Sequence, residues 1–428
     1  MRKKVALILD NIYRDLDGIC ILASELKKIG LDTFIVPFNL MQHELYFVDF
    51  DYVLFNFYRK YNVSLIKELL NSGVCVGVLD TEGGIFSNLE NFFKTWPSES
   101  VVLEHPNFSY FFWGKKLFNL AINGFIKKGN AKLTGCPRFD VYKQTYLNRI
   151  EGDYILFNTN YSFYSPKFST GKKELMSTIR MIGNSAFYKK IFNEQKIERN
   201  ETVNLIKYIS SKTSKKIIIR PHPFENSIFY EKIFKTYNNV SVEIKGTVKN
   251  AIDGAFIVIQ RGCSTGLEAR LMGKVTISPD WHPYSHKTVA DKGNIFIKSK
   301  SALLKYIINY EKKRKPNRIS LTTKKQIEDY LYKNDGKSSY RVAIEIKKQM
   351  KSNGVNNFSF YFFKFLIKRF IYLPFNLKYY KLKGSWKNSS KYFDANTINS
   401  NFVNLNLNGI KSHHVHNYFS KTGILKIA

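Results

Sequence analysis

The 428-residue sequence has few cysteines, few acidic residues and no long apolar run, and each deficit excludes a class of protein. Its four cysteines lie far apart and form no CxxC pair, which argues against a disulfide framework or a zinc site and fits a reducing compartment. No stretch reaches the roughly 20 apolar residues that a transmembrane helix needs. The apolar run within MRKKVALILD is only about seven residues long and aspartates follow it closely, so we interpret it as a buried strand and not as a signal peptide. These absences predict a cytoplasmic protein.

Basic residues outnumber acidic ones by 67 to 34, and the resulting net charge of +33 attracts polyanions. Eleven of the basic residues, and no acidic residue, fall within 346–391, where they alternate with Phe, Tyr and Trp. This composition is typical of a segment that lies on an anionic membrane surface, so we expect a peripheral protein on the inner face of the plasma membrane. A helix packed on the protein with a solvated basic face is the alternative. Nucleic acid is not an expected partner, because the sequence contains no DNA- or RNA-binding motif.

Short apolar runs alternate with helical patterns along most of the chain, which is typical of doubly wound parallel sheets. The expected strands are 4–10, 51–57 and 74–80 in the first part and 153–159, 215–220, 255–260 and 274–278 in the second. We therefore predict an α/β fold with two Rossmann-like domains that face a cleft, where ligands bind at the carboxyl ends of the strands. The predicted domains are residues 1–145 and 146–345, followed by the basic aromatic segment 346–391 and an Asn-, Ser- and His-rich tail, 392–428, that we expect to be weakly ordered.

Two carboxylates, Asp80 and Glu82, come at the end of the strand 74–80 and precede two glycines. Glycines let a substrate approach the backbone closely, and apolar surroundings raise the pKa of a carboxyl towards the range of a general base. A turn in which Asp80 caps a helix is the alternative. We predict that one of the two carboxylates is the catalytic base, and the sequence leaves open which.

Arg220, His222 and Pro223 belong to the stretch Arg-Pro-His-Pro, which begins at the last residue of the strand 215–220. Two prolines restrict the backbone on both sides of the imidazole. Beside Arg220, the imidazole of His222 is placed to meet a phosphate or to protonate a leaving phosphate oxygen. The alternative is a rigid turn with a solvated histidine.

Small and hydroxyl-bearing residues follow the strand 255–260 and open a helix that contains Ser264, Thr265, Gly266 and Glu268. Free backbone N–H groups at the start of a helix, together with hydroxyls, favour an anion. The spacing is not that of a GxxxxGK[ST] loop, and a plain Ser/Thr N-cap is the alternative. We predict that these residues bind the nucleotide together with Arg220, His222 and Pro223.

Several motifs together resemble those of the bacterial surface-carbohydrate biosynthesis proteins, namely VLDTEGGIFSN, WG at 113–114, TGCPRFD, RPHP, CSTGLEARLMGK and DGKSSYR. More distantly, the chain resembles the CMP-sugar transferases of capsule synthesis, which are Kdo transferases and polysialyltransferases. The stretch 265–269 is also similar to UDP-GlcNAc 2-epimerases. Together the motifs cover about residues 1–345.

The resemblance to polysialyltransferases implies a GT-B fold with no catalytic metal and no cofactor besides the nucleotide-sugar cosubstrate. In that family an acidic motif supplies the base, a His-Pro motif contacts the CMP phosphate, and a Ser-Ser/Thr motif completes the nucleotide site. The matching positions are Glu82, His222 with Pro223, and Ser264 with Thr265. Asp-Thr-Glu-Gly stands where two adjacent acids are expected, so the choice between Asp80 and Glu82 and the stereochemical outcome stay open.

We therefore predict a metal-independent glycosyltransferase that moves Kdo or another nonulosonate from a CMP-sugar to a surface polysaccharide or a lipid-linked acceptor. Three alternatives belong to other classes. They are a CDP-alditol phosphotransferase of the teichoic-acid type, a UDP-sugar epimerase-like enzyme and a non-enzymatic basic scaffold. The sequence leaves the oligomeric state undecided.

Overall fold

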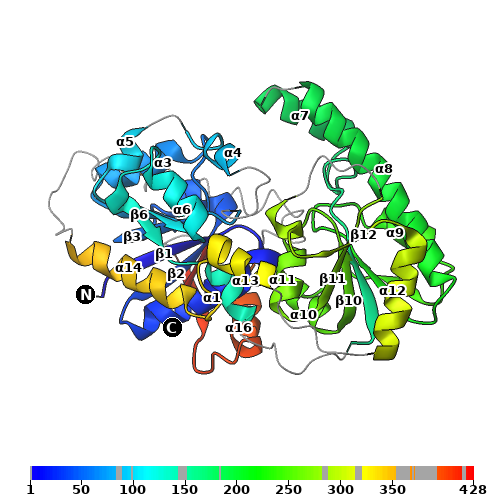
Figure 1. Cartoon of the computed structure of the whole chain (residues 1–428). Coiled ribbons are helices and arrows are strands. Elements are labelled where there is room, and N and C mark those ends of the chain that lie inside the picture. Colours follow the sequence, from blue (N-terminus) through cyan, green and yellow to red (C-terminus); the bar gives the residue numbers. More distant parts are fainter. Residues whose placement is uncertain are drawn as a thin grey trace. The chain divides into compact units, whose positions relative to one another are not determined.

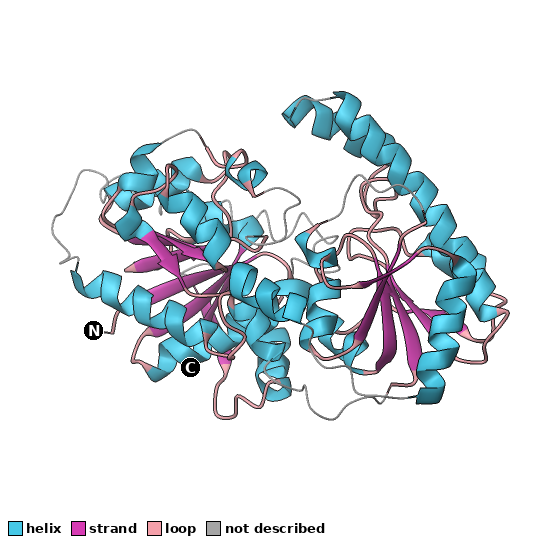
Figure 2. Cartoon of the chain, viewed as in Figure 1, coloured by secondary structure: helices cyan, strands magenta, loops and turns pink. Residues whose placement is uncertain are grey.

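The chain forms two compact units in a computed structural model (Figures 1 and 2). Unit 1 comprises Met1–Lys143 and Gln326–Ala428, so both chain ends belong to it, and unit 2 comprises Gln144–Lys325. The structure describes residues 2–82, 89–97, 100–142, 152–182, 185–281, 288–313, 321–352, 367–368, 371, 393–416 and 421–428.

Unit 1 contains a sheet with the strand order β13-β14-β2-β1-β3-β4-β5-β6. The strands are β1 Lys4–Leu9, β2 Asp32–Pro37, β3 Tyr52–Phe55, β4 Cys75–Val78, β5 Phe108–Phe112, β6 Ala131–Leu133, β13 Ser412–His416 and β14 Lys421–Ile427. Strands β1 to β6 are parallel, whereas β14 is antiparallel to β2 and β13 is antiparallel to β14. The short apolar runs become buried parallel strands because helices cover both faces of the sheet.

The helices of unit 1 divide between the two faces of its sheet (Figure 1). They are α1 Ile12–Lys28, α2 Met41–Glu44, α3 Val63–Asn71, α4 Glu90–Phe93, α5 Ser100–Glu104, α6 Lys115–Ile122, α14 Ser338–Ser352 and α16 Ala395–Asn404. Successive side chains of a strand point to opposite faces. Ala6 and Ile8 therefore enter the same core as apolar residues of α3 and α6. Helix α1 contacts α14 and α16, and these three helices lie together on the other face.

Unit 2 contains a parallel sheet with the order β12-β11-β10-β7-β8-β9. Its strands are β7 Tyr154–Asn158, β8 Lys216–Arg220, β9 Val240–Val242, β10 Ala255–Gln260, β11 Val275–Pro279 and β12 Ile295–Ile297. Its helices are α7 Gly171–Ile182, α8 Ser185–Ser210, α9 Ile228–Phe234, α10 Val248–Asp253, α11 Thr265–Leu271 and α12 Lys300–Lys313, and α13 Leu321–Gln326 follows at its border. Apolar residues of α8, α9 and α12 share a core with one face of the sheet, while α10 and α11 lie on the other face (Figures 1 and 2).

These two doubly wound units confirm the predicted α/β class and the predicted pair of Rossmann-like sheets. The first helix, α1, begins at Ile12. Asn11 caps it by accepting the N–H of Tyr13 at 3.0 Å. Gly18 lies inside this helix. Glycine is needed there because a side chain would collide with the backbone of Arg138, whose nitrogen would lie 2.6 Å from a Cβ at that position.

The C-terminal region differs from the prediction in its domain assignment. Residues 326–345 belong to unit 1 and not to the second domain. The contacts that hold them join two motifs far apart in the sequence, because the Asp140 carboxylate accepts the N–H groups of Ser338 and Ser339 at 3.0 and 2.7 Å. Arg341 also donates to the carbonyl of Thr134 at 2.6 Å. These long-range contacts, rather than local composition, place α14 in unit 1.

The expectation of a weakly ordered tail is wrong for residues 393–416 and 421–428, which form α16, β13 and β14. Strand β14 extends the sheet, with Leu425 opposite Ile35, and the N–H of Gly423 donates to the buried Glu44 carboxylate at 2.7 Å. The polar composition of the tail concealed one short apolar strand.

Most of the basic aromatic segment 346–391 lies outside the described residues. Within the described residues, we find no helix with the length and apolarity to cross a membrane.

Replacing Leu425 by Ala tests whether the tail is part of the folded unit. Leu425 is fully buried against β2. We expect L425A to lower the free energy of unfolding of unit 1 by about 2–3 kcal/mol through lost burial and a residual cavity. Chemical denaturation measures this change. The matched control is V403A on α16, a side chain that is 68% exposed, for which we expect at most about 0.5 kcal/mol. Equal stability of the two variants would show that β14 does not support the sheet.

Candidate functional site

The strand order of unit 1 reverses direction between β1 and β3, where ligands bind in doubly wound sheets, outside the carboxyl ends of the strands. Polar residues follow each of these strands. Asp10 and Asn11 come directly after β1, Asn56 directly after β3, and Asp80 two residues after β4. The backbone N–H of Thr81 donates to the carbonyl of Asn56 at 3.1 Å, which ties the last two strand ends together.

Asp80 is fully buried and its carboxylate has three partners within unit 1. Its Oδ2 lies 2.8 Å from Nη1 of Arg59 and accepts the hydroxyl of Tyr110 at 3.2 Å. Its Oδ1 accepts the N–H of Glu82 at 2.9 Å. Burial raises the pKa of Asp80, while Arg59 and the two hydrogen bonds act in the opposite direction. These contacts make Asp80 a residue that positions the following turn.

Glu82 is the accessible carboxylate of the predicted pair, because 57% of its side chain is exposed. Its Oε1 lies 3.5 Å from Nη1 of Arg14. Desolvation by neighbouring groups raises the pKa of Glu82, and the charge of Arg14 opposes the rise. Glu82 can therefore receive a proton from a ligand, whereas Asp80 has its oxygens occupied inside the protein.

Arg14 links the ends of β1 and β4 through one guanidinium group. It donates to Asp10 at 3.1 Å, to Asp15 at 2.8 and 2.9 Å, and to the Thr81 hydroxyl at 3.1 Å. Burial lowers the pKa of Arg14, but the nearby carboxylates outweigh this effect and raise it overall. The sequence prediction missed Arg14, although its place in the first turn of the helix after β1 was a usable signal.

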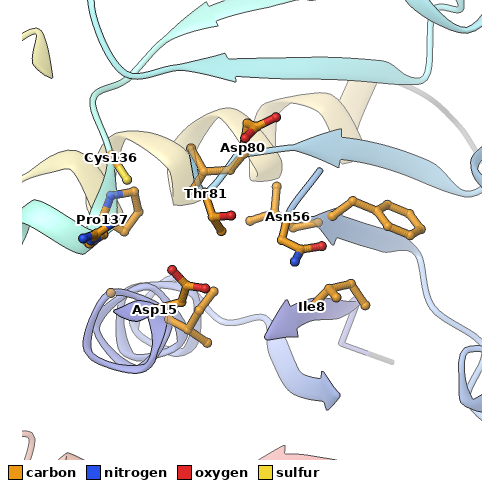
Figure 3. A pocket seen from close by; sticks show the side chains of 13 residues that line it. Ile8, Asp15, Asn56, Asp80, Thr81, Cys136 and Pro137 are labelled. Atoms are coloured by element: carbon orange, nitrogen blue, oxygen red, sulfur yellow. The ribbon is translucent and has the colours of Figure 1, made fainter. Parts of the chain in front are cut away.

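A small cavity lies under these strand ends, with room for about 40 Å³ (Figure 3). It is lined by residues of β1, α1, β3, the turn after β4 and the stretch Cys136–Arg138. Figure 3 shows the amide of Asn56 between Ile8 and Thr81. Asn56 is 4% exposed, and neither its nitrogen nor its oxygen has a hydrogen-bond partner among the described residues.

The strand order of unit 2 reverses between β7 and β10, which is the order of dinucleotide-binding Rossmann folds. The loops that follow β7, β8 and β10 therefore meet at one edge of the sheet. The N–H of Thr159 donates to the carbonyl of Arg220 at 3.1 Å, and the N–H of His222 donates to the carbonyl of Thr159 at 3.1 Å. These bonds bring the predicted Arg-Pro-His-Pro stretch to the switch point.

His222 is half-buried and its ring orientation is set by the backbone. The Nδ1 atom accepts the N–H of Phe224 at 3.3 Å, so the neutral imidazole carries its proton on Nε2. An Nε2–H group is a suitable donor to a phosphate oxygen. Pro223, between these residues, supplies a fixed backbone angle and no N–H group.

Arg220 contacts a neighbouring loop of unit 2 through its guanidinium group. It donates to the carbonyls of Lys245 and Gly246 at 2.9 and 2.6 Å, and the residue is 9% exposed. These bonds hold the loop that precedes α10. We therefore assign Arg220 a supporting position beside the site in this structure.

Glu225 is a residue of the site that the sequence prediction missed. It is 2% exposed, and its carboxylate accepts the hydroxyls of Thr159 and Tyr230 at 2.8 and 2.7 Å and the N–H of Tyr161 at 3.1 Å. Its own N–H donates to the carbonyl of His222 at 2.8 Å. Glu225 thus fixes the loops after β7 and β8 relative to each other. The sequence signal that could have identified Glu225 was an acidic residue two positions after Pro223.

The Asp291 side chain fixes the loop after β10 through hydrogen bonds. Its carboxylate accepts the N–H of Gly262 at 2.9 Å and the side-chain amide of Gln260 at 3.3 Å, and Gln260 in turn accepts the N–H of Cys263 at 3.0 Å. Ser264 is the N-cap of α11. This arrangement places the loop at the same sheet edge as His222, because β10 and β8 both flank β7.

The remaining predicted nucleotide-binding residues lie in α11 and are mostly covered. Thr265 is 6% exposed and its hydroxyl lies 3.2 Å from Sγ of Cys263. Gly266 allows close packing, since a Cβ there would approach the Gln260 side chain to 2.3 Å. Glu268 is fully buried. Gly266 and Glu268 therefore shape the helix, and Ser264 and Thr265 are the hydroxyls nearest the loop.

A second small cavity, about 30 Å³, lies at the switch point of unit 2. Its lining includes Asn158 and Gln260 from the ends of β7 and β10, and Arg261, whose Nη1 lies 3.3 Å from the Glu198 carboxylate. The described residues contain no group of three or more His, Cys, Asp or Glu side chains arranged to hold a metal ion.

No protein-family model and no curated protein matches this chain. Solved structures do match it in fold. The wall teichoic acid polymerase TagF, in its H548A form, is 11% identical, with a TM-score of 0.51, over 83% of this chain and 90% of that chain. The S. aureus MnaA–UDP structure is 12% identical, with a TM-score of 0.50, over 83% and 100% of the two chains. The UDP-GlcNAc 2-epimerase of Methanocaldococcus jannaschii, in complex with UDP-GlcNAc and UDP, is 16% identical, with a TM-score of 0.49, over 81% and 99%. Together with the two doubly wound units, the likenesses to TagF and MnaA identify the GT-B fold.

Proposed function

We propose that this chain is a GT-B enzyme that transfers a sugar from a nucleotide-sugar donor to an acceptor of the bacterial surface. One observation carries the proposal: the two switch points hold complementary chemistry. Unit 1 presents the exposed Glu82 carboxylate beside a buried, fully bonded Asp80. Unit 2 presents the Nε2–H of His222 close to a hydroxyl-bearing loop. Glycosyl transfer is assisted by a base for the acceptor hydroxyl and by a hydrogen-bond donor to the leaving phosphate, and these are the two groups that the units present.

Each group has a defined part in the proposed reaction. Glu82 accepts the proton of the acceptor hydroxyl as the oxygen attacks the anomeric carbon. The bond between the anomeric carbon and the phosphate oxygen breaks, and the nucleotide leaves with both electrons. His222 donates the hydrogen bond from Nε2 to that phosphate oxygen, and the loop that contains Ser264 and Thr265 binds the rest of the nucleotide.

The donor that we propose is a CMP-linked Kdo or other nonulosonate, on the strength of the motifs around Glu82, His222 and Ser264. The second candidate is transfer of an alditol phosphate from a CDP-alditol. Its support is the likeness in fold to a wall teichoic acid polymerase. Both reactions use a base in one unit and a phosphate-binding group in the other.

A donor screen tests the proposal directly. The protein is incubated with CMP-Kdo, CMP-sialic acid, CDP-glycerol and UDP-GlcNAc, each with a surface-polysaccharide extract, and consumption of each donor and release of nucleotide are followed. We expect a CMP-sugar to be consumed. Consumption of CDP-glycerol alone would establish the second candidate, and conversion of UDP-GlcNAc without release of UDP would establish an epimerase. No change in any donor would argue against the proposed function.

Replacing His222 by Ala is expected to lower kcat/KM for the donor at least about tenfold, which corresponds to about 1.4 kcal/mol of transition-state stabilisation. The matched control is H105A in unit 1. The Nδ1 atom of His105 also accepts the N–H of the residue two positions on, at 3.1 Å, but His105 precedes β5 at the opposite edge of its sheet. Equal kcat/KM in the two variants would leave His222 as a turn residue only.

We also propose contact with an anionic membrane through the basic aromatic segment. Of that segment beyond α14, the structure describes Ile367, Lys368 and Ile371; the two isoleucines are 47% and 53% exposed, and Lys368 lies 2.5 Å from Glu68. Each lysine near such a surface contributes about 1 kcal/mol. The double substitution of Lys381 and Lys383 by Gln should therefore weaken binding to phosphatidylserine liposomes about thirtyfold at low salt.

Cosedimentation measures this loss of liposome binding. The control is the same double substitution at Lys172 and Lys173, which are exposed on α7. Wild-type protein that stays in the supernatant with these liposomes would contradict the membrane proposal, and so would equal binding of the two double variants.

A further inference from the structure

The cavity at the switch point of unit 1 contains a polar group that the proposed reaction does not use. Asn56 follows β3 and is 4% exposed, and both polar atoms of its amide lack partners among the described residues. A buried amide without hydrogen bonds costs free energy. Asn130, also in unit 1, shows the ordinary situation, because its amide donates to the carbonyls of Leu103 and His105 at 2.9 Å each.

The other polar groups of the cavity are already occupied. Asp15 binds Arg14, Asp80 binds Arg59, and the Thr81 hydroxyl accepts from Arg14. Apart from Cys136 and Arg138, the rest of the lining is apolar and includes Ile8 and Pro137 (Figure 3). Among the described residues of the lining, the amide of Asn56 is therefore the buried polar group whose hydrogen bonds are left for a ligand. It offers one donor side and one acceptor side and carries no charge.

The size and chemistry of the cavity select one kind of chemical group. A space of about 40 Å³ is too small for a sugar ring but accommodates one or two non-hydrogen atoms. A hydroxymethyl group fits both features: its CH2 meets the apolar lining, and its hydroxyl both donates to and accepts from a carboxamide. A carboxylate can only accept hydrogen bonds, so it would leave the amide oxygen of Asn56 without a donor.

We infer that the Asn56 cavity is a subsite for a neutral hydroxymethyl group of the acceptor, which makes the acceptor a sugar or alditol with a free primary alcohol. This inference rests on the proposed function, in which unit 1 binds the acceptor. The hydroxymethyl group positions the acceptor and is not the reacting group, because the carboxylate of Glu82 is exposed outside the cavity. The cavity is not fully enclosed, and Thr81 and Arg138 of its lining are half-buried.

Binding of simple glycosides tests the inference without a donor. The probes are methyl glucoside and methyl galactoside, each with its 6-deoxy and its uronic acid counterpart, and saturation-transfer NMR measures their dissociation constants for the full chain. We expect at least one hexoside to bind about tenfold more tightly than its 6-deoxy and uronic acid counterparts. The preference should vanish in N56L, which keeps the approximate shape and removes both polar atoms.

The stability of the variants separates this role from a purely structural one. We expect N56L to keep or raise the denaturation midpoint, because it removes an unpartnered amide, whereas N130L should lower it by leaving two carbonyls unpaired. A midpoint that falls in N56L as much as in N130L would show that the amide is satisfied within the folded protein, for example by a bound water only, and would overturn the inference. Wild-type protein without preference for either hexoside would overturn it as well. Neither measurement involves a nucleotide, so a failed donor screen leaves the result interpretable.

Discussion

Replacing Glu82 by Gln is expected to lower kcat for sugar transfer by about 10²–10⁴-fold, the usual contribution of a general base. The amide keeps the shape of the side chain but cannot accept the proton of the acceptor hydroxyl. Nucleotide affinity, measured by calorimetry, should stay unchanged, because the predicted nucleotide-binding residues belong to unit 2. Stability should also change little, since Glu82 is 57% exposed and its contact with Arg14 spans 3.5 Å.

The control for this experiment is E104Q. Glu104 is an exposed carboxylate at the end of α5, in the same unit but away from the carboxyl ends of the strands. The E104Q variant should retain full activity. If E82Q retained activity while D80N lost it without loss of stability, the assignment of Glu82 as the base would be wrong, and Asp80 would take its place.

Replacing Asp80 by Asn should lower the free energy of unfolding of unit 1 by about 3 kcal/mol or more, in contrast to the effect of E82Q. Asp80 is fully buried, and its carboxylate lies 2.8 Å from Arg59. Removing one member of a buried ion pair leaves the other charge without compensation, which is much more costly than losing an exposed pair. Arg59 also packs over the rings of Phe57 and Phe92, at 5.3 and 5.8 Å, so it cannot turn to solvent without losing these contacts.

Chemical denaturation of D80N, with E25Q as the reference, measures this difference. The Glu25 carboxylate lies 2.7 Å from Lys28 on α1, and the lysine side chain is 62% exposed. Loss of that pair should change stability by no more than about 1 kcal/mol. Similar values for the two variants would mean that the Asp80–Arg59 pair does not hold the turn before Glu82.

The sequence located most strands and the ends at which ligands bind, because a buried strand is a continuous apolar run whose limits are marked by neighbouring polar residues. Thus Asp80, His222 and Ser264 were all identified as residues at or just beyond strand ends. The sequence pattern alone does not explain Gly18, which lies inside α1. Its actual role, close packing against Arg138, involves a residue far away in the chain.

The roles within the site depended on contacts that no local pattern contains. Asp80 and Glu82 are both acids in one turn, yet one is fully buried and the other is more than half exposed. The difference follows from Arg59 and Tyr110, which reach Asp80 from other strands and loops. Glu225 was missed for a similar reason, because its contacts with Thr159 and Tyr161 form only when β7 and β8 lie side by side.

By itself, the sequence determined that this protein has two α/β units and which residues follow their strands, since both depend on short-range apolar patterns and turn residues. The tertiary structure alone decided the order of the strands, the membership of the C-terminal residues in unit 1 and the isolation of the Asn56 amide. These features depend on pairs that are remote in sequence, such as Gly423 with Glu44, 379 positions apart, and Ser338 with Asp140, 198 positions apart. Contacts at such separations form only when the strands assemble, because they depend on the packing of whole elements and not on the conformation of any one segment.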